Sequence, residues 1–329
     1  MTNPKISVVM PIYNVEPYVA DAIHSVLLQS FEDFELICVD DGGTDRSMEI
    51  VQEFKDPRIR IVSQTNMGLA AARNSGIAHA NGEFVALLDS DDCWHKDKLM
   101  LHYIHLTANP QVGVSYAGSR FIDKNGAKLD VAMRPKIGPI SSIDILCRNP
   151  IGNGSAPVLR REHLERAAYM HAEVSNRKCW FDESFRQSED IEMWVRLAVK
   201  HGVLFEGIGG LLTEYRIIAG ALSANVVKQY LSWNRMLRKT AEYAPEFTAK
   251  HGDRARAYQL RYLARRSLQL GNVVLAKDFL ARSFKLKPKI IIEEPRKSVI
   301  TSGAVLAGLI LGKRRFSALL RSFLKEAAC

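Results

Sequence analysis

Residues 6–45 read ISVVMPIYNVEPYVADAIHSVLLQSFEDFELICVDDGGTD, and the order of apolar and polar residues within them decides the fold class. Residues 6–10 (ISVVM) and 34–40 (FELICVD) are short apolar runs rich in β-branched residues, typical of buried strands. Between them, apolar residues recur at helical spacing from Val15 to Leu28, which predicts a helix. A strand, a helix and a second strand in this order indicate an α/β protein with a mostly parallel sheet.

The same alternation continues to about residue 89. It predicts a helix over 45–54, a strand over 58–64, a helix over 69–80 and a strand over 82–89. Parallel strands end at one edge of their sheet, where open α/β folds bind ligands. Polar clusters follow three of the strands, and they lie at 11–14, 40–45 and 89–92. We therefore expect one crevice that is lined from three separate stretches of chain.

The rest of the chain is expected to be more helical. Helices are predicted over 96–107 and 189–201, a hairpin should turn at Asn125 and Gly126, and helices predominate from about residue 226. This divides the chain into a catalytic α/β domain over 1–222 and a helical C-terminal region over 223–329. Within that region, residues 261–288 have the Leu-Gly turn and closing proline of a single tetratricopeptide-like hairpin, although an ordinary helical hairpin packed on the enzyme is the favoured interpretation.

Charge is unevenly distributed along the 329 residues, whose formal net charge is +9. Residues 250–329 hold 18 Lys and Arg against 5 Asp and Glu, which leaves residues 1–249 with a net charge of −4. A basic tail can bind nucleic acid or an anionic membrane. It has no clear pattern of basic residues interleaved with aromatic ones, so nucleic-acid binding is not expected.

The tail also contains an uncharged stretch, residues 298–312, followed by Lys313, Arg314 and Arg315. This stretch is shorter than the roughly 20 apolar residues of a membrane-spanning helix. Residues 298–329 therefore either lie on an anionic membrane surface or form a helix that covers the core of the domain.

The N-terminus and the cysteines indicate where the protein works. Residues 1–14 lack the charged region and long apolar stretch of a signal peptide. The five cysteines are scattered and show no CxxC spacing, which suits a reducing compartment. We expect a cytoplasmic protein, at most peripheral at the inner face of the cell membrane.

Three carboxylates, those of Asp89, Asp91 and Asp92, directly follow a predicted buried strand. Carboxylates this close repel one another unless a cation compensates. Mg²⁺ or Mn²⁺ bound to a diphosphate suits them, because such an ion takes one or two protein carboxylates and fills its shell with phosphate oxygens. A solvated acidic loop is the alternative. The second cluster, residues 40–45, is a glycine-containing turn whose carboxylates could accept hydrogen bonds from a base or ribose, or could only cap the next helix.

These clusters belong to three blocks, residues 7–45, 64–94 and 187–198, that together resemble the family 2 inverting glycosyltransferases of the GT-A fold. The blocks stand in the family's order and spacing, and the resemblance covers about residues 5–220. It implies a GT-A nucleotide-diphospho-sugar transferase fold for residues 1–222. It also implies transfer of a hexose or N-acetylhexosamine from a nucleotide donor, favoured to be UDP, to a carbohydrate or lipid-linked acceptor. Exopolysaccharide, capsule or lipopolysaccharide synthesis is the expected setting.

The resemblance also assigns roles to residues. In the donor site it places Pro11, Tyr13 and Asp41 at the nucleobase, Arg73 near the base or phosphates, Arg216 at the diphosphate, and Asp91 and Asp92 at ribose and metal, with Asp92 the favoured ligand. Asp190 of the Glu189-Asp190 pair is the general base, and the expected acceptor or sugar pocket contains Glu189, Asn153, Gly154 and Trp94. One position departs from the family pattern, because Ile218 stands where a histidine is common.

The assigned chemistry needs few groups. In an inverting transfer the acceptor hydroxyl attacks the anomeric carbon from the face opposite the leaving group, and one carboxylate removes its proton. Judged alone, Asp190 also fits a helix cap, Trp94 either stacks on a sugar or packs in the core, and residues 152–155 could be a plain loop.

Two other classes of function were weighed. A sugar-phosphate nucleotidyltransferase usually carries a Gly-rich basic loop after its first strand, whereas residues 11–18 read PIYNVEPY. A non-catalytic nucleotide-sugar-binding adaptor would not need the four carboxylates of Asp41, Asp91, Asp92 and Asp190. Both classes are therefore disfavoured.

Overall fold

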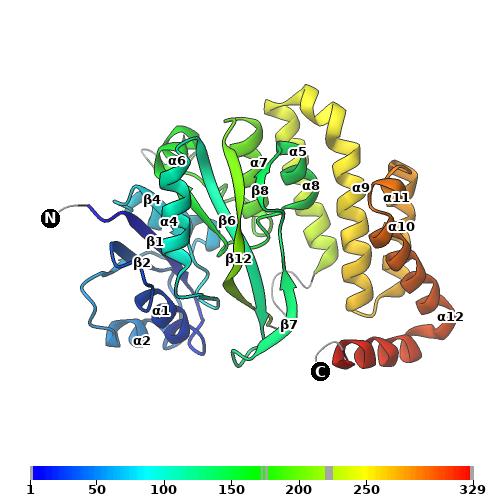
Figure 1. Ribbon diagram of the computed structural model, residues 1–329, viewed down its shortest axis with the longest axis horizontal. Coiled ribbons are helices and arrows are strands. Elements are labelled where there is room, and N and C mark those ends of the chain that lie inside the picture. Colours follow the sequence, from blue (N-terminus) through cyan, green and yellow to red (C-terminus); the bar gives the residue numbers. More distant parts are fainter. Residues whose placement is uncertain (1–2, 172, 175–176, 219–224, 327–329) are drawn as a thin grey trace. The chain divides into compact units, whose positions relative to one another are not determined.

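The computed structural model describes residues 3–171, 173–174, 177–218 and 225–326, with side chains through residue 312. The chain divides into two compact units (Figure 1). The first comprises residues 1–145 and 150–218 and contains the β-sheet, and the second comprises residues 146–149 and 219–329 and is helical.

The first unit is built from strands and helices that alternate along the chain. Its strands are β1 Ile6–Ile12, β2 Phe34–Asp40, β3 Ile59–Ser63, β4 Phe84–Leu87, β5 Cys93–Trp94, β6 Val112–Ile122, β7 Lys128–Met133, β8 Gly138–Ile140, β9 Pro157–Arg160, β10 Tyr169–Met170, β11 Lys178–Cys179 and β12 Leu204–Arg216. Its helices are α1 Val19–Leu27, α2 Ser47–Glu53, α3 Leu69–Ala78, α4 Lys98–Ala108, α6 Arg161–Ala167 and α7 Glu189–Val199. The residues of α5, Ser142–Arg148, divide between the two units.

The main sheet has the strand order β3-β2-β1-β4-β9-β6-β12-β5, with β7 beside β6 and β8 beside β12. Strands β1 to β4 are mutually parallel, as the sequence predicts. Strand β9 is antiparallel to both β4 and β6, and β12 is parallel to β6. The two antiparallel steps restore the original direction, so β1, β2, β4, β6 and β12 all end at the same edge of the sheet.

Helices pack on both faces of this sheet. Alternate residues of β1, among them Val8 and Met10, form one core with apolar residues of α1 and α4. On the opposite face α3 lies so close to the sheet that a Cβ on Gly76 would meet Cγ1 of Val9 at 2.2 Å. The predicted hairpin is present as the antiparallel pair β6 and β7.

The second unit contains α8 Val226–Tyr243, α9 Pro245–Gln269, α10 Val273–Leu286, α11 Ile290–Glu293 and α12 Pro295–Glu326. Helices α9 and α10 form the predicted hairpin, in which Asn272 accepts a hydrogen bond from the N–H of Leu275 and so caps α10. Among the described residues, no helix combines the length and apolar character needed to cross a bilayer.

Candidate active site

The acidic loop that follows β4, residues 89–92, lies at the edge where the parallel strands end. Asp92 is buried, and its carboxylate points into the protein. Its Oδ2 accepts a hydrogen bond from Oγ of Ser155 (2.6 Å), and its Oδ1 accepts one from the N–H of Arg216 (2.9 Å). Both of its oxygens are thus engaged within the protein, and the expected role of Asp92 as the favoured metal ligand stays a prediction.

Asp91 is the member of the loop with a free carboxylate. Its side chain accepts no hydrogen bond from any other residue that the structure describes, whereas Asp89 is paired with Arg73. Burial and the negative charge of Asp89 raise the pKa of Asp91 to about 6. The loop therefore presents a carboxylate whose charge the protein leaves poorly compensated.

Arg73, in the body of α3, connects the acidic loop to α7. Its Nη2 donates to Asp89 at 2.6 Å and its Nη1 to Glu189 at 2.9 Å, with the guanidinium 5.3 Å from the centre of the Phe181 ring. Burial opposes the charge of Arg73, but the two carboxylates outweigh it and raise the pKa of Arg73. The two side chains are buried against each other, and the expected places of Arg73 near the base or phosphates and of Glu189 in a sugar pocket stay predictions.

Asp190 stands beside Glu189 in the first turn of α7, where the helix dipole favours negative charge. Burial and the charge of Glu189 raise the pKa of Asp190 to about 7. Burial also raises the pKa of Tyr215, and so do the charges of four carboxylates within electrostatic range: Asp92, Asp89, Asp91 and Asp190. The structure thus brings the start of α7, the acidic loop and the end of β12 into one neighbourhood.

Asp41 lies at the end of β2 and faces the start of α3. Its Oδ1 accepts hydrogen bonds from Nε2 of Gln64 (2.7 Å) and the N–H of Met67 (3.0 Å), and its Oδ2 accepts one from the N–H of Gly68 (2.9 Å). Helix α3 therefore links Asp41 at its N-terminus to the charge cluster around Arg73.

The other two residues expected at the nucleobase, Pro11 and Tyr13, lie in β1 and just after it. Pro11 lies within the strand and is buried, whereas Tyr13, just beyond its end, is 48% exposed. The ring of Tyr13 is thus exposed at the edge where the parallel strands end, and its expected contact with a nucleobase stays a prediction.

Residues 153–155 run beside the acidic loop. Asn153 is buried and donates to Oγ of Ser119 at 2.8 Å, and a Cβ on Gly154 would meet Nη2 of Arg73 at 2.3 Å. Trp94 is also buried, and its indole Nε1 donates to the carbonyl of Ser155 at 3.0 Å. Of the two readings for Trp94, the structure therefore favours packing over stacking on a sugar.

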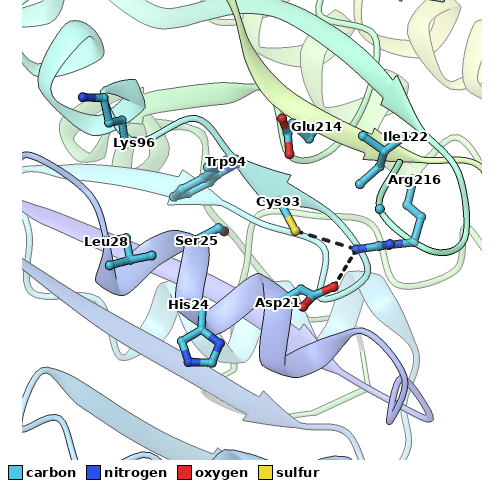
Figure 2. Close-up of a pocket in the computed structure, with 11 residues that line it drawn as sticks. Asp21, His24, Ser25, Leu28, Cys93, Trp94, Lys96, Ile122, Glu214 and Arg216 are labelled. Atoms are coloured by element: carbon cyan, nitrogen blue, oxygen red, sulfur yellow. Dashed lines mark hydrogen bonds and ion pairs between the residues drawn. The ribbon is translucent and has the colours of Figure 1, made fainter. Parts of the chain in front are cut away.

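Arg216 is enclosed at the end of β12, and its expected contact with a diphosphate stays a prediction. Its Nε donates to the carbonyl of Asp91 (2.7 Å), and its Nη2 lies 3.3 Å from Oδ2 of Asp21 and 3.8 Å from Sγ of Cys93. Figure 2 shows the guanidinium between these two side chains, in a groove of about 370 Å³ that α1 and β5 also line. Ile218, where the family commonly has a histidine, comes two residues later in the chain.

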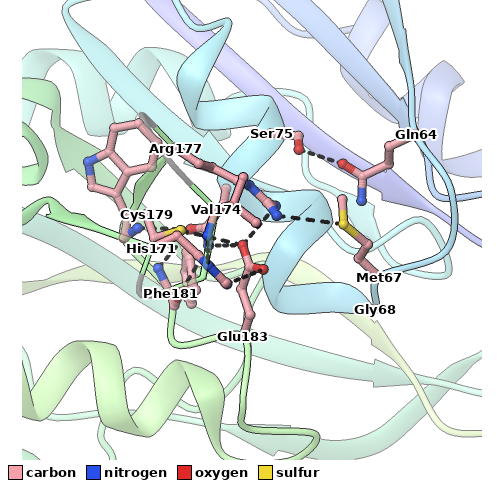
Figure 3. A network of polar contacts seen from close by, with 12 residues as sticks. Gln64, Met67, Gly68, Ser75, His171, Val174, Arg177, Cys179, Phe181 and Glu183 are labelled. Atoms are coloured by element: carbon pink, nitrogen blue, oxygen red, sulfur yellow. Dashed lines mark hydrogen bonds and ion pairs between the residues drawn. The ribbon is translucent and has the colours of Figure 1, made fainter.

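Sequence reasoning missed Asn74, which anchors the segment before α7. Its side chain accepts from the N–H groups of Trp180 and Phe181 and donates to Glu183, which also pairs with Arg177 at 2.8 Å (Figure 3). A polar residue between apolar positions of a buried helix is the local signal, but its partners lie more than 100 residues away in the chain.

Comparison with known proteins identifies the class. The chain matches the model of glycosyl transferase family 2 over residues 7–165. It is 32% identical over 231 residues to TuaG of Bacillus subtilis, named as a candidate teichuronic acid biosynthesis glycosyltransferase, a match that covers 68% of this chain and 84% of TuaG. The chain belongs to glycosyl transferase family 2, and it is a glycosyltransferase.

Two further similarities extend this result. WfgD of Escherichia coli, named UDP-Glc:alpha-D-GlcNAc-diphosphoundecaprenol beta-1,3-glucosyltransferase, is 28% identical over 225 residues, 68% of this chain and 81% of WfgD. The mannosyltransferase PcManGT of Pyrobaculum calidifontis, solved with GDP-Man and Mn²⁺, superposes with a TM-score of 0.59 at 18% identity, over 100% of this chain and 87% of PcManGT. The predicted GT-A fold is thereby confirmed.

Proposed function

We propose that this glycosyltransferase inverts the anomeric centre as it transfers a hexose or N-acetylhexosamine. The donor is a nucleotide-diphosphate sugar, with UDP favoured, and the acceptor is a carbohydrate or lipid-linked sugar of a cell-surface polysaccharide. The names of TuaG and WfgD support this setting. The observation that carries the proposal is the Arg73 bridge, because it brings Asp190 and the acidic loop to the same edge of the sheet.

In this proposal Asp190 is the general base. Its carboxylate accepts the proton of the acceptor hydroxyl while the hydroxyl oxygen forms the new bond to the anomeric carbon. The bond from that carbon to the diphosphate oxygen breaks on the opposite face, so the configuration inverts. Glu189, which pairs with Arg73, lies next to Asp190, and its negative charge raises the affinity of Asp190 for the proton.

The residues of the acidic loop fit a divalent cation, for which we propose Mn²⁺ or Mg²⁺. Among the described residues, no three His, Cys, Asp or Glu side chains gather into a complete metal site. One or two carboxylates are enough for an ion that takes its other ligands from phosphates. Asp91 would hold it, with Asp92 supporting the loop from behind, and when bound the ion would neutralise charge on the diphosphate.

A donor screen tests this function. Purified protein is incubated with a panel of nucleotide sugars and Mn²⁺ or Mg²⁺, with and without EDTA, and release of the nucleoside diphosphate is measured. We expect release from one or two donors, lost with EDTA. A parallel incubation supplies a sugar 1-phosphate and a nucleoside triphosphate, and release of pyrophosphate from the triphosphate would instead indicate a nucleotidyltransferase. Binding of a donor without any turnover would indicate an adaptor.

We also propose that the second unit contacts an anionic membrane surface from the cytoplasmic side. Apolar side chains of α11 and α12 are exposed, among them Ile292 (81%), Val299 (66%), Ile300 (59%) and Ile310 (74%). The opposite side of α12 is buried at Ser298, Thr301 and Val305, so the exposed face is separate from the face that packs inside the unit. Cationic residues flank the uncharged stretch in the sequence, which complements anionic headgroups.

Vesicle binding tests this contact. The double variant Ile300→Asp, Ile310→Asp should bind phosphatidylglycerol vesicles at least about a hundredfold more weakly, since two buried isoleucines together contribute about 3–6 kcal/mol and each 1.4 kcal/mol is a factor of ten. The matched control is Ile104→Asp, which alters an isoleucine 56% exposed on α4. Equal vesicle binding by the wild type and the double variant would contradict the membrane contact. Dimerisation of the wild type but not of the double variant in sedimentation experiments would also contradict it, because a second copy would then cover the apolar face.

A further inference from the structure

The hydroxyl of Ser155 lies between the two ends of the acidic loop. Ser155 is fully buried. Its Oγ accepts a hydrogen bond from the N–H of Asp89 (3.0 Å) and donates one to Oδ2 of Asp92 (2.6 Å). Both partners lie more than 60 residues before Ser155 in the chain. One side chain therefore fixes both ends of the short loop that carries Asp91.

The segment that carries Ser155 is itself held in place. The carbonyl of Ser155 accepts hydrogen bonds from Nε1 of Trp94 (3.0 Å) and Oγ1 of Thr213 (3.3 Å). The next carbonyl, that of Ala156, accepts one from Nζ of Lys98 (2.7 Å), which is also buried. With its backbone fixed by donors from three elements, Ser155 is a rigid support for the loop.

We propose that Ser155 is a positioning residue that sets the spacing of Asp89 and Asp92 and thereby holds Asp91 where it would bind the cation. This inference rests on the proposed function, because it requires a cation at the acidic loop. Residues that orient a metal ligand from behind commonly change metal affinity or activity 10- to 100-fold when they are removed. Ser155 acts through the loop, since its hydroxyl is occupied by Asp89 and Asp92.

The test compares Mn²⁺ binding by the wild type and Ser155→Ala in the presence of UDP. Free Mn²⁺ is measured by electron paramagnetic resonance, which needs no turnover. We expect affinity for Mn²⁺ to fall by about 10- to 100-fold. We also expect kcat at saturating Mn²⁺ to stay within a few-fold of the wild type. A purely structural role would lower Tm and leave the Mn²⁺ affinity unchanged.

Ser7→Ala is the matched control. The hydroxyl of Ser7 is also buried, accepts from the N–H of Gly82 (2.8 Å) and donates to Oε1 of Glu35 (2.7 Å), but it lies near the start of β1, away from the acidic loop. Ser7→Ala should lower Tm about as much as Ser155→Ala does, and it should leave the affinity for Mn²⁺ unchanged. The inference is overturned if Ser155→Ala also binds Mn²⁺ like the wild type.

Two further outcomes bear on the role of Ser155: a variant that does not fold, and a wild type that binds no Mn²⁺. If Ser155→Ala does not fold, Thr213→Val is measured in its place. The valine keeps the side-chain shape of Thr213 but removes one hydrogen-bond donor to the carbonyl of Ser155. This variant should weaken Mn²⁺ binding by a smaller factor, and unchanged affinity would overturn the inference. A wild type that binds no Mn²⁺ with UDP would contradict the proposed function itself, and the role of Ser155 would fall with it.

Discussion

Arg73 carries the positive charge on which Asp89 and Glu189 depend. Its side chain is 2% exposed, and each terminal nitrogen serves a different carboxylate. Removing one partner from buried ion pairs leaves the other charges uncompensated, which costs about 3–5 kcal/mol. An ammonium group cannot reproduce the fork of a guanidinium, so lysine is a poor substitute at this position.

Arg73→Met should therefore lower the free energy of unfolding by about 3–5 kcal/mol in urea denaturation, and Arg73→Lys by less. The control is Arg46→Met, which removes the pair between Arg46 and Glu49 on the exposed surface of α2. This control should leave the urea midpoint unchanged. If Arg73→Met also unfolded at the wild-type midpoint, the bridge between the loop and α7 would have no structural importance.

Asp190→Asn separates catalysis from donor binding. The amide keeps the shape of the side chain but cannot accept the acceptor's proton, so kcat should fall about 10²- to 10⁴-fold. The Kd of the donor, measured by calorimetry with Mn²⁺, should stay within about twofold. Turnover at the wild-type rate would remove Asp190 as the base.

The pKa of Asp190 predicts opposite pH dependences for rate and stability. Because burial and Glu189 raise this pKa to about 7, kcat/KM should rise about tenfold per pH unit below pH 7 and then level off. Stability changes the other way. The folded protein retains a proton that the unfolded chain releases near pH 4, so the free energy of unfolding falls as pH rises from about 4 to 7. Asp190→Asn should therefore raise Tm more at pH 8 than at pH 5, where only about a third of this loss has occurred. An equal change in Tm at both pH values would contradict the raised pKa.

At the scale of elements, α3 organises the site. Asp41 accepts hydrogen bonds at its N-terminus, and Arg73 and Asn74 project from its body toward the acidic loop and the segment before α7. The helix can lie this close to the sheet because residue 76 has no side chain, and a Cβ there would also meet Cγ2 of Val39 at 3.1 Å.

Gly76→Ala should therefore destabilise the fold by about 1–3 kcal/mol, because α3 would have to move away from β1. The control is Gly252→Ala in α9, where a Cβ would meet no atom closer than 3.4 Å. That substitution should stabilise the protein by about 0.5–1 kcal/mol, since alanine suits a helix interior better than glycine. Thermal unfolding measures both effects, and a neutral Gly76→Ala would contradict the close packing of α3.

Elements with a strong local pattern are predictable from the sequence. The strand predicted over 34–40 matches β2 residue for residue, because a buried parallel strand is a continuous apolar run. Helix α1 begins at Val19, although its apolar periodicity starts at Val15. The N–H groups of Val15 and Glu16 bind the side chains of Ser47 and Asp45 instead, and no local pattern shows this.

The candidate site is predictable only in part for the same reason. Its carboxylates stand at strand ends and at a helix start, so their residue types and positions are visible in the sequence. Which of them are free is decided by partners far along the chain, such as Ser155 for Asp92 and Arg216 for the carbonyl of Asp91. Those contacts favour Asp91 over Asp92 as the ligand of a cation, whereas the roles expected of Asp92 and Arg216 stay predictions.

At the scale of the whole molecule, charge separates by function. Residues 1–249 carry a net charge of −4 and gather carboxylates at the proposed donor site, whereas residues 250–329 carry the positive surplus. An acidic site repels a nucleotide diphosphate unless a cation lies between them. Donor binding and cation binding should therefore depend on each other.

The most direct test of the central claim is a crystal structure with Mn²⁺ and UDP, in which anomalous scattering locates the manganese. We expect a manganese peak bound by the carboxylate of Asp91 and by the diphosphate, with the carboxylate of Asp190 facing the same cavity. A nucleotide bound away from the acidic loop, or a manganese ion with no ligand from residues 89–92, would contradict it.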